Sequence, residues 1–369
     1  MRPTHELGAY RGRRVLVTGH TGFKGAWLSL WLADLGATVT GFSHDVPTEP
    51  SLFAAAGLDR RLRDRRADIR DADTIRKVVA DERPELILHL AAQPIVRRAL
   101  VDPHETVTTN VVGTLNVLEA ARSVPGVTGV VIVTSDKVYR DRQAGAPYRE
   151  DDVLGGHEPY GASKAAAEII TEVYTHAGFH RAAASANVPL IVVARAGNVI
   201  GGGDWAADRL VPDIVRAILE GRDVTLRYPH SVRPWQHVLE PLGGYLSLGL
   251  LILNGGPLPR CVNFGPSERN PLPVAGLVSL FLSTWGPNGT RVHIDADRSG
   301  VEAALLQVDS TLARTMLGWR ALWEAPRAVA ESASWYRSWA AGEDAARLCR
   351  AQIAAYMRDW DDTAADNAA

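Results

Sequence analysis

Tyr160 and Lys164 are spaced so that they could act together on a proton. They lie in the segment 160–177, whose apolar pattern predicts a helix, and residues i and i+4 share one face of a helix. A tyrosine with its ordinary pKa of about 10 is a poor base at neutral pH. A nearby ammonium group favours the phenolate, so we expect Lys164 to lower the pKa of Tyr160 and make it a general base. The alternative for this spacing in isolation is an ordinary surface pair.

A second group of chemically useful residues, Ser135, Asp136 and Lys137, follows the apolar run at 129–134. That run is typical of a buried strand, and the carboxyl ends of parallel strands line the ligand crevice of a doubly wound sheet. We therefore expect the Ser135 hydroxyl to meet the Tyr160 phenol beside a bound cofactor. The two charged side chains can reach the same crevice. The alternative for them is a salt bridge at the strand end.

A glycine-rich loop with the sequence GHTGFKG follows the apolar run VLVT at 15–18 and precedes a long apolar segment at 26–37. This order predicts a strand, a turn and a helix whose free N-terminus can bind a pyrophosphate. Lys24 is either a phosphate neighbour or a solvated side chain, and the loop as a whole could instead be a plain tight turn. The residues predicted to contact the cofactor here are Gly19, Thr21, Gly22, Phe23, Lys24 and Gly25.

The ends of two further predicted strands contribute to the cofactor site. Asp68, followed by Ile69, comes after a third strand, where its carboxylate could accept a hydrogen bond from an adenine amino group. Leu90, Ala91 and Ala92 end the strand predicted at 85–92, and the small side chains leave room for a flat ring. The alternatives are a solvated loop acid and simple sheet packing.

The end of the second strand bears on the choice between NAD and NADP. The acid expected there for the adenine ribose is missing, because the run TVTGF leads into Ser43 and His44. Ser43 could still bond a ribose hydroxyl, and His44 is no arginine clamp for a 2′-phosphate. We therefore predict NAD as the cofactor.

Apolar runs and amphipathic segments alternate through the first 195 residues, which predicts at least six strands before residue 200 and a doubly wound parallel α/β sheet. The sequence GNVIGGGDW then interrupts the pattern and marks the start of a smaller, mixed α/β domain. We predict a dinucleotide-binding domain over 1–195 plus about 235–265, a substrate domain over 196–234 and 266–358, and a frayed tail over 359–369. Helices are expected at 72–81, 106–122, 160–177, 210–220 and 242–253, and a later strand at 224–228.

The composition argues against several classes of protein. The chain has 369 residues, and its 40 basic and 42 acidic residues give a net charge of −2, which provides no electrostatic surface for nucleic acid. No stretch approaches the ~18 apolar residues of a membrane span, and the N-terminus lacks the apolar core of a secretory signal. Cys261 and Cys349 form no CxxC motif, and His176 and His180 lack the acids of a zinc motif. We therefore expect a cytoplasmic protein without a metal site.

The motifs TGHTGFKG, TSDK, YxxxK and NVIGGGDW follow one another in the order of the extended short-chain dehydrogenase/reductase family, which the chain resembles over nearly its whole length. The longer motifs LAAQPIVR, TSDKVY and RPWQHVLEP are similar to those of the nucleotide-sugar 4,6-dehydratases in that family, with CDP-glucose as the favoured substrate. The resemblance implies a Rossmann domain that binds NAD and a smaller domain that binds a nucleotide sugar. It also implies a homodimer, or alternatively a tetramer, built through a helix bundle at the sheet edge.

The resemblance also implies roles for the residues at the strand end and on the helix. Ser135, Tyr160 and Lys164 would serve the oxidation of carbon 4 of the sugar. Asp136 would protonate the departing 6-hydroxyl, which requires a raised pKa. Lys137 stands where many relatives have glutamate, and it would either remove the hydrogen on carbon 5 or stabilise the negative charge formed there.

For the substrate, the resemblance transfers Asn198, Arg209 and Arg233 to the diphosphate, whose oxygens suit an amide donor and guanidinium forks. Gln93 is expected to line the sugar or base pocket. The segment 296–309 departs from the family pattern, which has a histidine before the Glu-Ala pair and a lysine where Gln307 stands, and this bears on the identity of the base. Two alternatives stay open: a nucleotide-sugar 4-epimerase of the same family, and a catalytically silent NAD-binding regulator.

Overall fold

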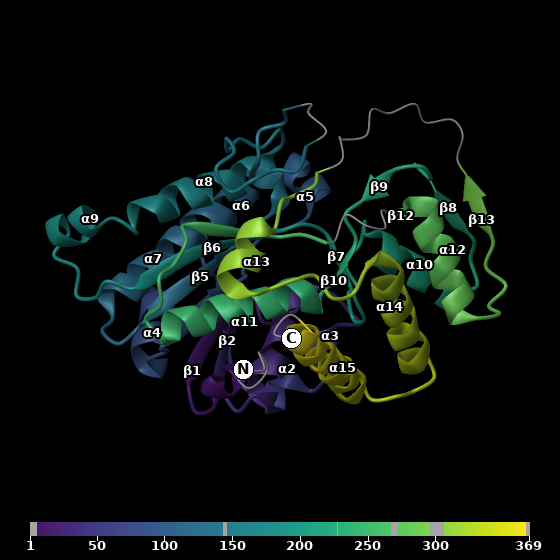
Figure 1. Cartoon of the computed structure of the whole chain (residues 1–369), viewed down its shortest axis with the longest axis horizontal. Coiled ribbons are helices and arrows are strands. Elements are labelled where there is room, and N and C mark those ends of the chain that lie inside the picture. The colour runs from purple at the N-terminus through teal and green to yellow at the C-terminus, as the bar shows by residue number, and fades with distance from the viewer. Residues whose placement is uncertain (1–5, 143–145, 227, 267–271, 295–305, 367–369) are drawn as a thin grey trace.

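A parallel sheet of seven strands forms the centre of the molecule in the computed structural model, which describes residues 6–142, 146–226, 228–266, 272–294 and 306–366 (Figure 1). The strand order β11-β6-β5-β4-β1-β2-β3 confirms the predicted doubly wound α/β fold. The order reverses between β1 and β4, and the ends of these strands open the crevice in which such sheets bind ligands. The strands are β1 (Arg14–Thr18), β2 (Thr38–Ser43), β3 (Arg63–Arg66), β4 (Leu86–His89), β5 (Gly129–Val133), β6 (Leu190–Ala196) and β11 (Cys261–Phe264).

Helices cover both faces of this sheet, because alternate residues of its strands bury apolar side chains on opposite faces. In β1, Val15 and Val17 belong to one core, and Leu16 belongs to the other. The helices of the first core are α2 (Phe23–Asp34), α11 (Leu239–Leu253) and α15 (Ala345–Asp366). Those of the second core are α4 (Ala72–Glu82), α7 (Gly113–Ser123) and α8 (Pro159–Val173).

The six strands predicted before residue 200 are present as β1 to β6, whereas two predicted helices are divided. The segment 106–122 contains the end of α6 (Pro103–Val107), a π-helical segment η3 (Thr108–Val112) and α7. The segment 160–177 ends as α8 at Val173, and the short α9 (Ala177–Ala182) follows. The remaining short elements of this half are α3 (Leu52–Ala55), α5 (Val96–Val101) and the 3₁₀ turns η1 (Gly8–Tyr10), η2 (Leu58–Arg60) and η4 (Asp136–Val138).

The segments beyond β6 build a smaller mixed α/β region at one end of the sheet, on the right in Figure 1. Its strand pairs are β7 (Val199–Ile200) with β10 (Gln236–His237), β9 (Val232–Arg233) with β12 (Leu272–Pro273), and β8 (Val224–Leu226) with β13 (Val292–Ile294). Its helices are α10 (Leu210–Leu219), α12 (Val274–Trp285) and α14 (Ala325–Ala340), and α13 (Thr311–Leu317) lies near α11. Most of the segment 296–309 lies outside the described residues.

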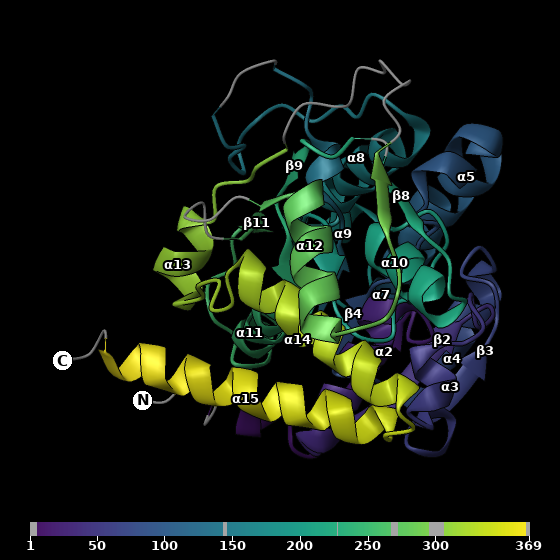
Figure 2. The same cartoon turned by 90° about the vertical axis from the view of Figure 1, so that its right-hand side faces the viewer.

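The prediction of a frayed tail over 359–369 is wrong for its described part, because α15 continues to Asp366. Trp360 is buried in the first core, with its ring centroid 6.0 Å from that of Tyr356. Arg350 donates to both carboxylate oxygens of Asp34 on α2, at 2.8 Å each. Figure 2 shows α15 as a long helix beside α2. Among the described helices, none combines the length and the apolar character needed to cross a membrane.

Candidate active site

The glycine loop between β1 and α2 is packed too tightly for larger residues. A Cβ on Gly19, which has φ of +75°, would lie 2.7 Å from the amide nitrogen of Ala91, and a Cβ on Gly25 would lie 2.1 Å from the carbonyl oxygen of Gly19. Gly22 is the N-cap residue of α2 and supplies no side chain to bond the first amides of the helix. Those free N–H groups and the helix dipole suit a pyrophosphate, so the loop fits a dinucleotide.

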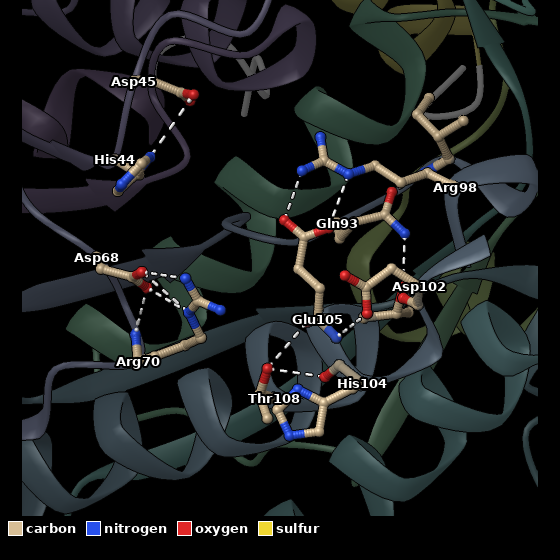
Figure 3. Close-up of polar contacts among 12 residues, drawn as sticks. His44, Asp45, Asp68, Arg70, Gln93, Arg98, Asp102, His104, Glu105 and Thr108 are labelled. Carbon is tan, nitrogen blue, oxygen red and sulfur yellow. Dashed lines mark hydrogen bonds and ion pairs between the residues drawn. The ribbon is translucent and has the colours of Figure 1, made fainter. Parts of the chain in front are cut away.

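Ser43 supports this loop from the end of β2. Its hydroxyl lies 2.9 Å from Nδ1 of His20 and accepts a hydrogen bond from the amide of Thr21. An acid does follow β2, at Asp45, whose carbonyl accepts from the Thr21 hydroxyl at 2.6 Å. The Asp45 side chain is exposed and beside His44 (Figure 3). Asp45 lies two residues beyond the end of β2 and is a candidate for the acid that positions 43 and 44 lack.

The predicted adenine end of the site contains Asp68, which faces Arg70 (Figure 3). The Arg70 side chain donates to the Asp68 carboxylate at 2.5 to 3.0 Å, and this hydrogen bonding lowers the pKa of Asp68. The Asp68 carboxylate is therefore ionised, and Arg70 uses part of its capacity to accept hydrogen bonds. Ile69 is buried against Gly113, and the residues that end β4, Leu90, Ala91 and Ala92, are half-buried.

Ser135 and Asp136 lie together where β5 turns into η4. Ser135 is the N-cap residue of η4: its hydroxyl accepts from the amide of Lys137 at 3.2 Å and donates to the Asp136 carboxylate at 3.0 Å. Asp136 is buried, and its burial raises the pKa of the carboxyl, in the direction that a general acid requires. Gly197 at the end of β6 gives it room, since a Cβ there would lie 2.8 Å from Asp136 Oδ2.

Tyr160 and Lys164 lie on α8, whose first turn is fixed by Glu158, which accepts from the amides of Tyr160 and Gly161 at 2.7 and 2.8 Å. The expected lowering of the Tyr160 pKa is wrong: burial raises it to about 12, although a hydrogen bond with Ser135 opposes the rise. The Lys164 ammonium instead donates to the carbonyl of Val133 at 3.2 Å. Burial lowers the pKa of Lys164 to about 8.

Lys24 is not a solvated side chain. Burial and then the nearby charge of Arg209 lower its pKa to about 7, whereas Asp136 raises it. Its ammonium lies 3.5 Å from the phenol oxygen of Tyr245 on α11, a residue that sequence analysis missed. The glycine loop thus contributes a cation to the same crevice as Ser135, Asp136 and Tyr160.

The four predicted substrate residues are placed differently. Arg209 is held by Asp204 at 2.9 Å, and its charge acts on both Lys24 and Tyr160. Asn198 is exposed between β6 and β7, and Arg233 is half-buried in β9. Gln93 is buried, with its amide oxygen bonded to the amide of Ile95 and its amide nitrogen donating to Thr106, so it shapes the loop after β4.

The two histidines at 176 and 180 do not form a shared site. His176 is the N-cap residue of α9, and buried His180 bonds the carbonyl of Tyr174 and the hydroxyl of Ser185 at 2.7 and 3.1 Å. In the described part of the chain, no group of three or more metal-ligating side chains occurs.

Comparisons with known proteins agree with this geometry. The profile of the NAD dependent epimerase/dehydratase family matches residues 15–242. A CDP-glucose 4,6-dehydratase of Salmonella typhimurium is 40% identical over 349 residues, which are 94% of this chain and 97% of that protein. A dTDP-glucose 4,6-dehydratase of Streptomyces griseus is 31% identical over 334 residues, 88% of this chain and 95% of that protein.

A solved structure is similar over the same length. DesIV, a dTDP-glucose 4,6-dehydratase of Streptomyces venezuelae with NAD and TYD bound, superposes with a TM-score of 0.70 at 26% identity, over 88% of this chain and 97% of that one. The family match covers more than half of the chain and includes the glycine loop, Ser135 and α8. The chain therefore belongs to the NAD-dependent epimerase/dehydratase family.

Proposed function

We propose that this chain is an NAD-dependent nucleotide-sugar 4,6-dehydratase that converts CDP-glucose into CDP-4-dehydro-6-deoxyglucose and water. The observation that carries the proposal is the buried carboxyl group of Asp136, with a raised pKa, next to Ser135 in the crevice. A 4-epimerase needs no acid for a 6-hydroxyl, whereas a dehydratase does. The 40% identity to a CDP-glucose 4,6-dehydratase over 94% of the chain supports the same reaction.

The chemistry that NAD supplies when bound is the removal of a hydride from carbon 4 and its return to carbon 6. The glycine loop would hold the pyrophosphate, and Asp45 and Asp68 would face the ribose and adenine. Tyr160 would take the proton of the 4-hydroxyl in its phenolate form, which burial disfavours and the Ser135 hydrogen bond and the charge of Arg209 favour, while the Ser135 hydroxyl bonds the same sugar oxygen. Lys164, with a pKa of about 8, is mostly protonated at neutral pH and supplies a positive charge on the same helix face.

Elimination then breaks two bonds of the sugar. Asp136 would give its proton to the departing 6-hydroxyl, which leaves as water. Lys137, next to it on η4 and half-buried, would accept the proton from carbon 5 as a neutral amine and return it there when carbon 6 is reduced, or stabilise the enolate if another base exchanges that proton. Asn198, Arg209 and Arg233 are proposed to hold the diphosphate.

Three further features are proposed with this function. The segments 1–195 and about 235–265 form the NAD-binding domain, and 196–234 with 266–358 form the sugar-nucleotide domain. Exposed apolar residues on α5, α6 and α8 support a homodimer through this face; they are Leu100, Val101, Val107, Ile169 and Val173. Cys261 and Cys349 are free buried thiols, which supports a reducing compartment, the cytoplasm.

The decisive experiment mixes the purified protein and NAD with CDP-, UDP-, GDP- and dTDP-glucose and follows each sugar by mass spectrometry. We expect CDP-glucose to lose one water without accumulation of NADH. Rearrangement of the sugar without loss of water would indicate an epimerase. Binding of NAD without any change in the four sugars would indicate a silent regulator.

A further inference from the structure

A chain of buried hydrogen bonds runs beneath the crevice, centred on His89 at the end of β4. Nδ1 of His89 lies 2.7 Å from the Thr18 hydroxyl at the end of β1. Nε2 lies 3.0 Å from the Thr114 hydroxyl on α7. The Thr18 oxygen also accepts from the amide of Ala91 at 3.1 Å, and the Thr114 hydroxyl bonds the carbonyl of Asn110 at 2.7 Å. All these side chains are buried.

The partners fix the direction of each bond and the tautomer of His89. A carbonyl cannot donate, so the single hydroxyl proton of Thr114 goes to Asn110, and His89 Nε2 must carry the proton that Thr114 accepts. Nδ1 of the neutral ring is then an acceptor, and the Thr18 hydroxyl donates to it. A proton on Nδ1 would leave the Thr18 hydroxyl proton without this acceptor. Burial also lowers the pKa of His89 to about 3, so the ring is neutral at the pH values where enzymes work.

The same chain continues to the tyrosine helix through Asn110, which lies in the π-helical segment η3. Its side-chain oxygen accepts from the amide of Gln93 at 2.8 Å, and its nitrogen donates to the carbonyl of Gln93 and to the hydroxyl of Ser163 at 3.1 and 2.9 Å. Ser163 in turn donates to the carbonyl of Tyr160 at 2.7 Å. π-Helical turns are often found at functional sites. Here the turn places Asn110 between the end of β4 and the first turn of α8.

The hydrogen-bonded chain therefore joins the two halves of the proposed reaction site. At one end it holds Thr18 and Ala91, where the glycine loop makes its closest approach to β4, since a Cβ on Gly19 would lie 2.7 Å from the Ala91 nitrogen. At the other end it holds the backbone of Tyr160. Each N–H or O–H proton named in the chain has one acceptor, so a shift of one end strains the bonds to the other.

We propose that His89 is a positioning residue that holds the glycine loop and the first turn of α8 in one fixed arrangement, so that the Tyr160 phenol meets the 4-hydroxyl of the sugar beside the cofactor. The proposal rests on the function proposed above for Tyr160. His89 itself contacts neither substrate nor cofactor in this scheme. It acts as a neutral bridge that accepts from β1 and donates to α7.

The test compares His89→Leu, which removes both bonds, with His89→Gln, whose amide can accept from Thr18 and donate to Thr114. We expect His89→Leu to lower kcat for CDP-glucose about 10- to 100-fold, because small misplacements of reacting groups are costly, with KM changed less than about twofold. We expect it to weaken NAD binding about threefold to tenfold in calorimetry, because the loop is displaced at Thr18. His89→Gln should recover both values to within about threefold.

His180→Leu is the matched control, since it removes two hydrogen bonds of another buried histidine, on α9, away from the chain described here. It should leave kcat and NAD binding within about twofold of the wild type. In a Tyr160→Phe background, His89→Leu should lower the residual kcat less than about threefold, because the phenol that it positions is gone. Thr114→Val breaks the middle of the chain at constant shape and replaces His89→Leu if that variant does not fold.

Three results would overturn the proposal. In the first, His89→Leu has the same kcat and NAD affinity as His180→Leu. In the second, His89→Leu loses the same factor in kcat with and without the Tyr160 hydroxyl. In the third, His89→Gln is as impaired as His89→Leu. If the wild type turns over none of the four sugars, the proposed function fails. The NAD calorimetry of the same variants then still decides whether His89 positions the glycine loop.

Discussion

Two buried carboxyl groups lie on either side of the end of β5, and their surroundings differ. Thr134 donates to Glu168 on α8 at 2.5 Å, and Arg195 adds three hydrogen bonds to the same carboxylate at 2.5 to 3.0 Å. The neighbouring Ser135 donates to Asp136, whose pKa is raised by burial without such an arginine fork. The two buried carboxyl groups therefore differ in their partners. An arginine fork binds Glu168, which suits a structural role, whereas the burial of Asp136 favours its protonated form.

The largest effect that we predict is on Asp136. Asp136→Asn keeps the shape and the hydrogen bond with Ser135 but removes the proton, so dehydration should fall about 100- to 10,000-fold. The measurement is kcat by loss of water in mass spectrometry, with the urea midpoint as the control for folding. Full turnover in this variant would mean that another group is the acid. Asp136 would then not differ from Glu168 by a catalytic role.

For Glu168, the predicted effect is on stability rather than on catalysis. Glu168→Gln leaves the buried charge of Arg195 without its counter-ion, and the free energy of unfolding should fall by about 3 to 5 kcal/mol. Glu172→Gln is the matched control on the same helix, because its pair with Arg260 is exposed and should be worth less than about 1 kcal/mol. Urea denaturation measures both. Equal losses in the two variants would contradict a structural role for Glu168.

A third buried acid, Glu240 on α11, combines several hydrogen-bond donors with a raised pKa. It accepts from the amides of Leu322 and Trp323 and from the Tyr356 phenol, yet burial raises its pKa from 4.5 to about 7. The folded state then favours the protonated form. Its contribution to stability, on the order of 3 kcal/mol, is present below about pH 4.5 and is lost as the pH rises to about 7.

Urea denaturation between pH 4.5 and 8 checks this sign. We expect Glu240→Gln, which has no titrating group at this position, to remove that part of the pH dependence. If the free energy of unfolding changes over this window by the same amount in the wild type and in Glu240→Gln, the donors around Glu240 offset the effect of its burial.

The smallest predicted effect concerns an exposed acid. Asp45 follows β2, and its exposed side chain pairs with the exposed ring of His44, so its proposed use is to accept hydrogen bonds from the adenine ribose. Asp45→Ala should weaken NAD binding about tenfold and NADP binding less, since a 2′-phosphate is repelled by this carboxylate. Calorimetry with both dinucleotides measures the difference. Asp73→Ala, an exposed acid on α4, is the control that should change neither affinity.

The strands and the glycine loop could be predicted because their signals are local. Apolar runs such as 15–18 and 129–133 are buried strands, and Ser135 follows one of them where a parallel sheet opens. The pKa of Tyr160 could not be predicted, because the loss of water around the phenol depends on side chains from several distant segments. Gln93 has a sequence position typical of a pocket, but its amide is used by its own loop.

Other predictions from the sequence failed because they depend on packing between segments that are far apart in the chain. The residues 359–366 are polar and rich in alanine, yet they continue a helix because Trp360 reaches the core beside Tyr356. The π-helical segment η3 interrupts the helix expected over 106–122, and its bonds to the ends of β4 and α8 lie outside any local window. Lys24 appeared solvated or phosphate-bound, and only the fold brings it near Asp136.

The contact between the last helix and the first long helix sets an order of assembly during synthesis. Trp31 of α2 packs edge to face on Tyr356 of α15 at 5.9 Å between ring centroids, and Asp34 is bridged by Arg350. The ribosome releases α15 long after α2, so a nascent chain that already contains the whole glycine loop still exposes one apolar side of the helix behind it. A chain that stops before residue 345 would leave this side of α2 uncovered, because α15 begins at Ala345.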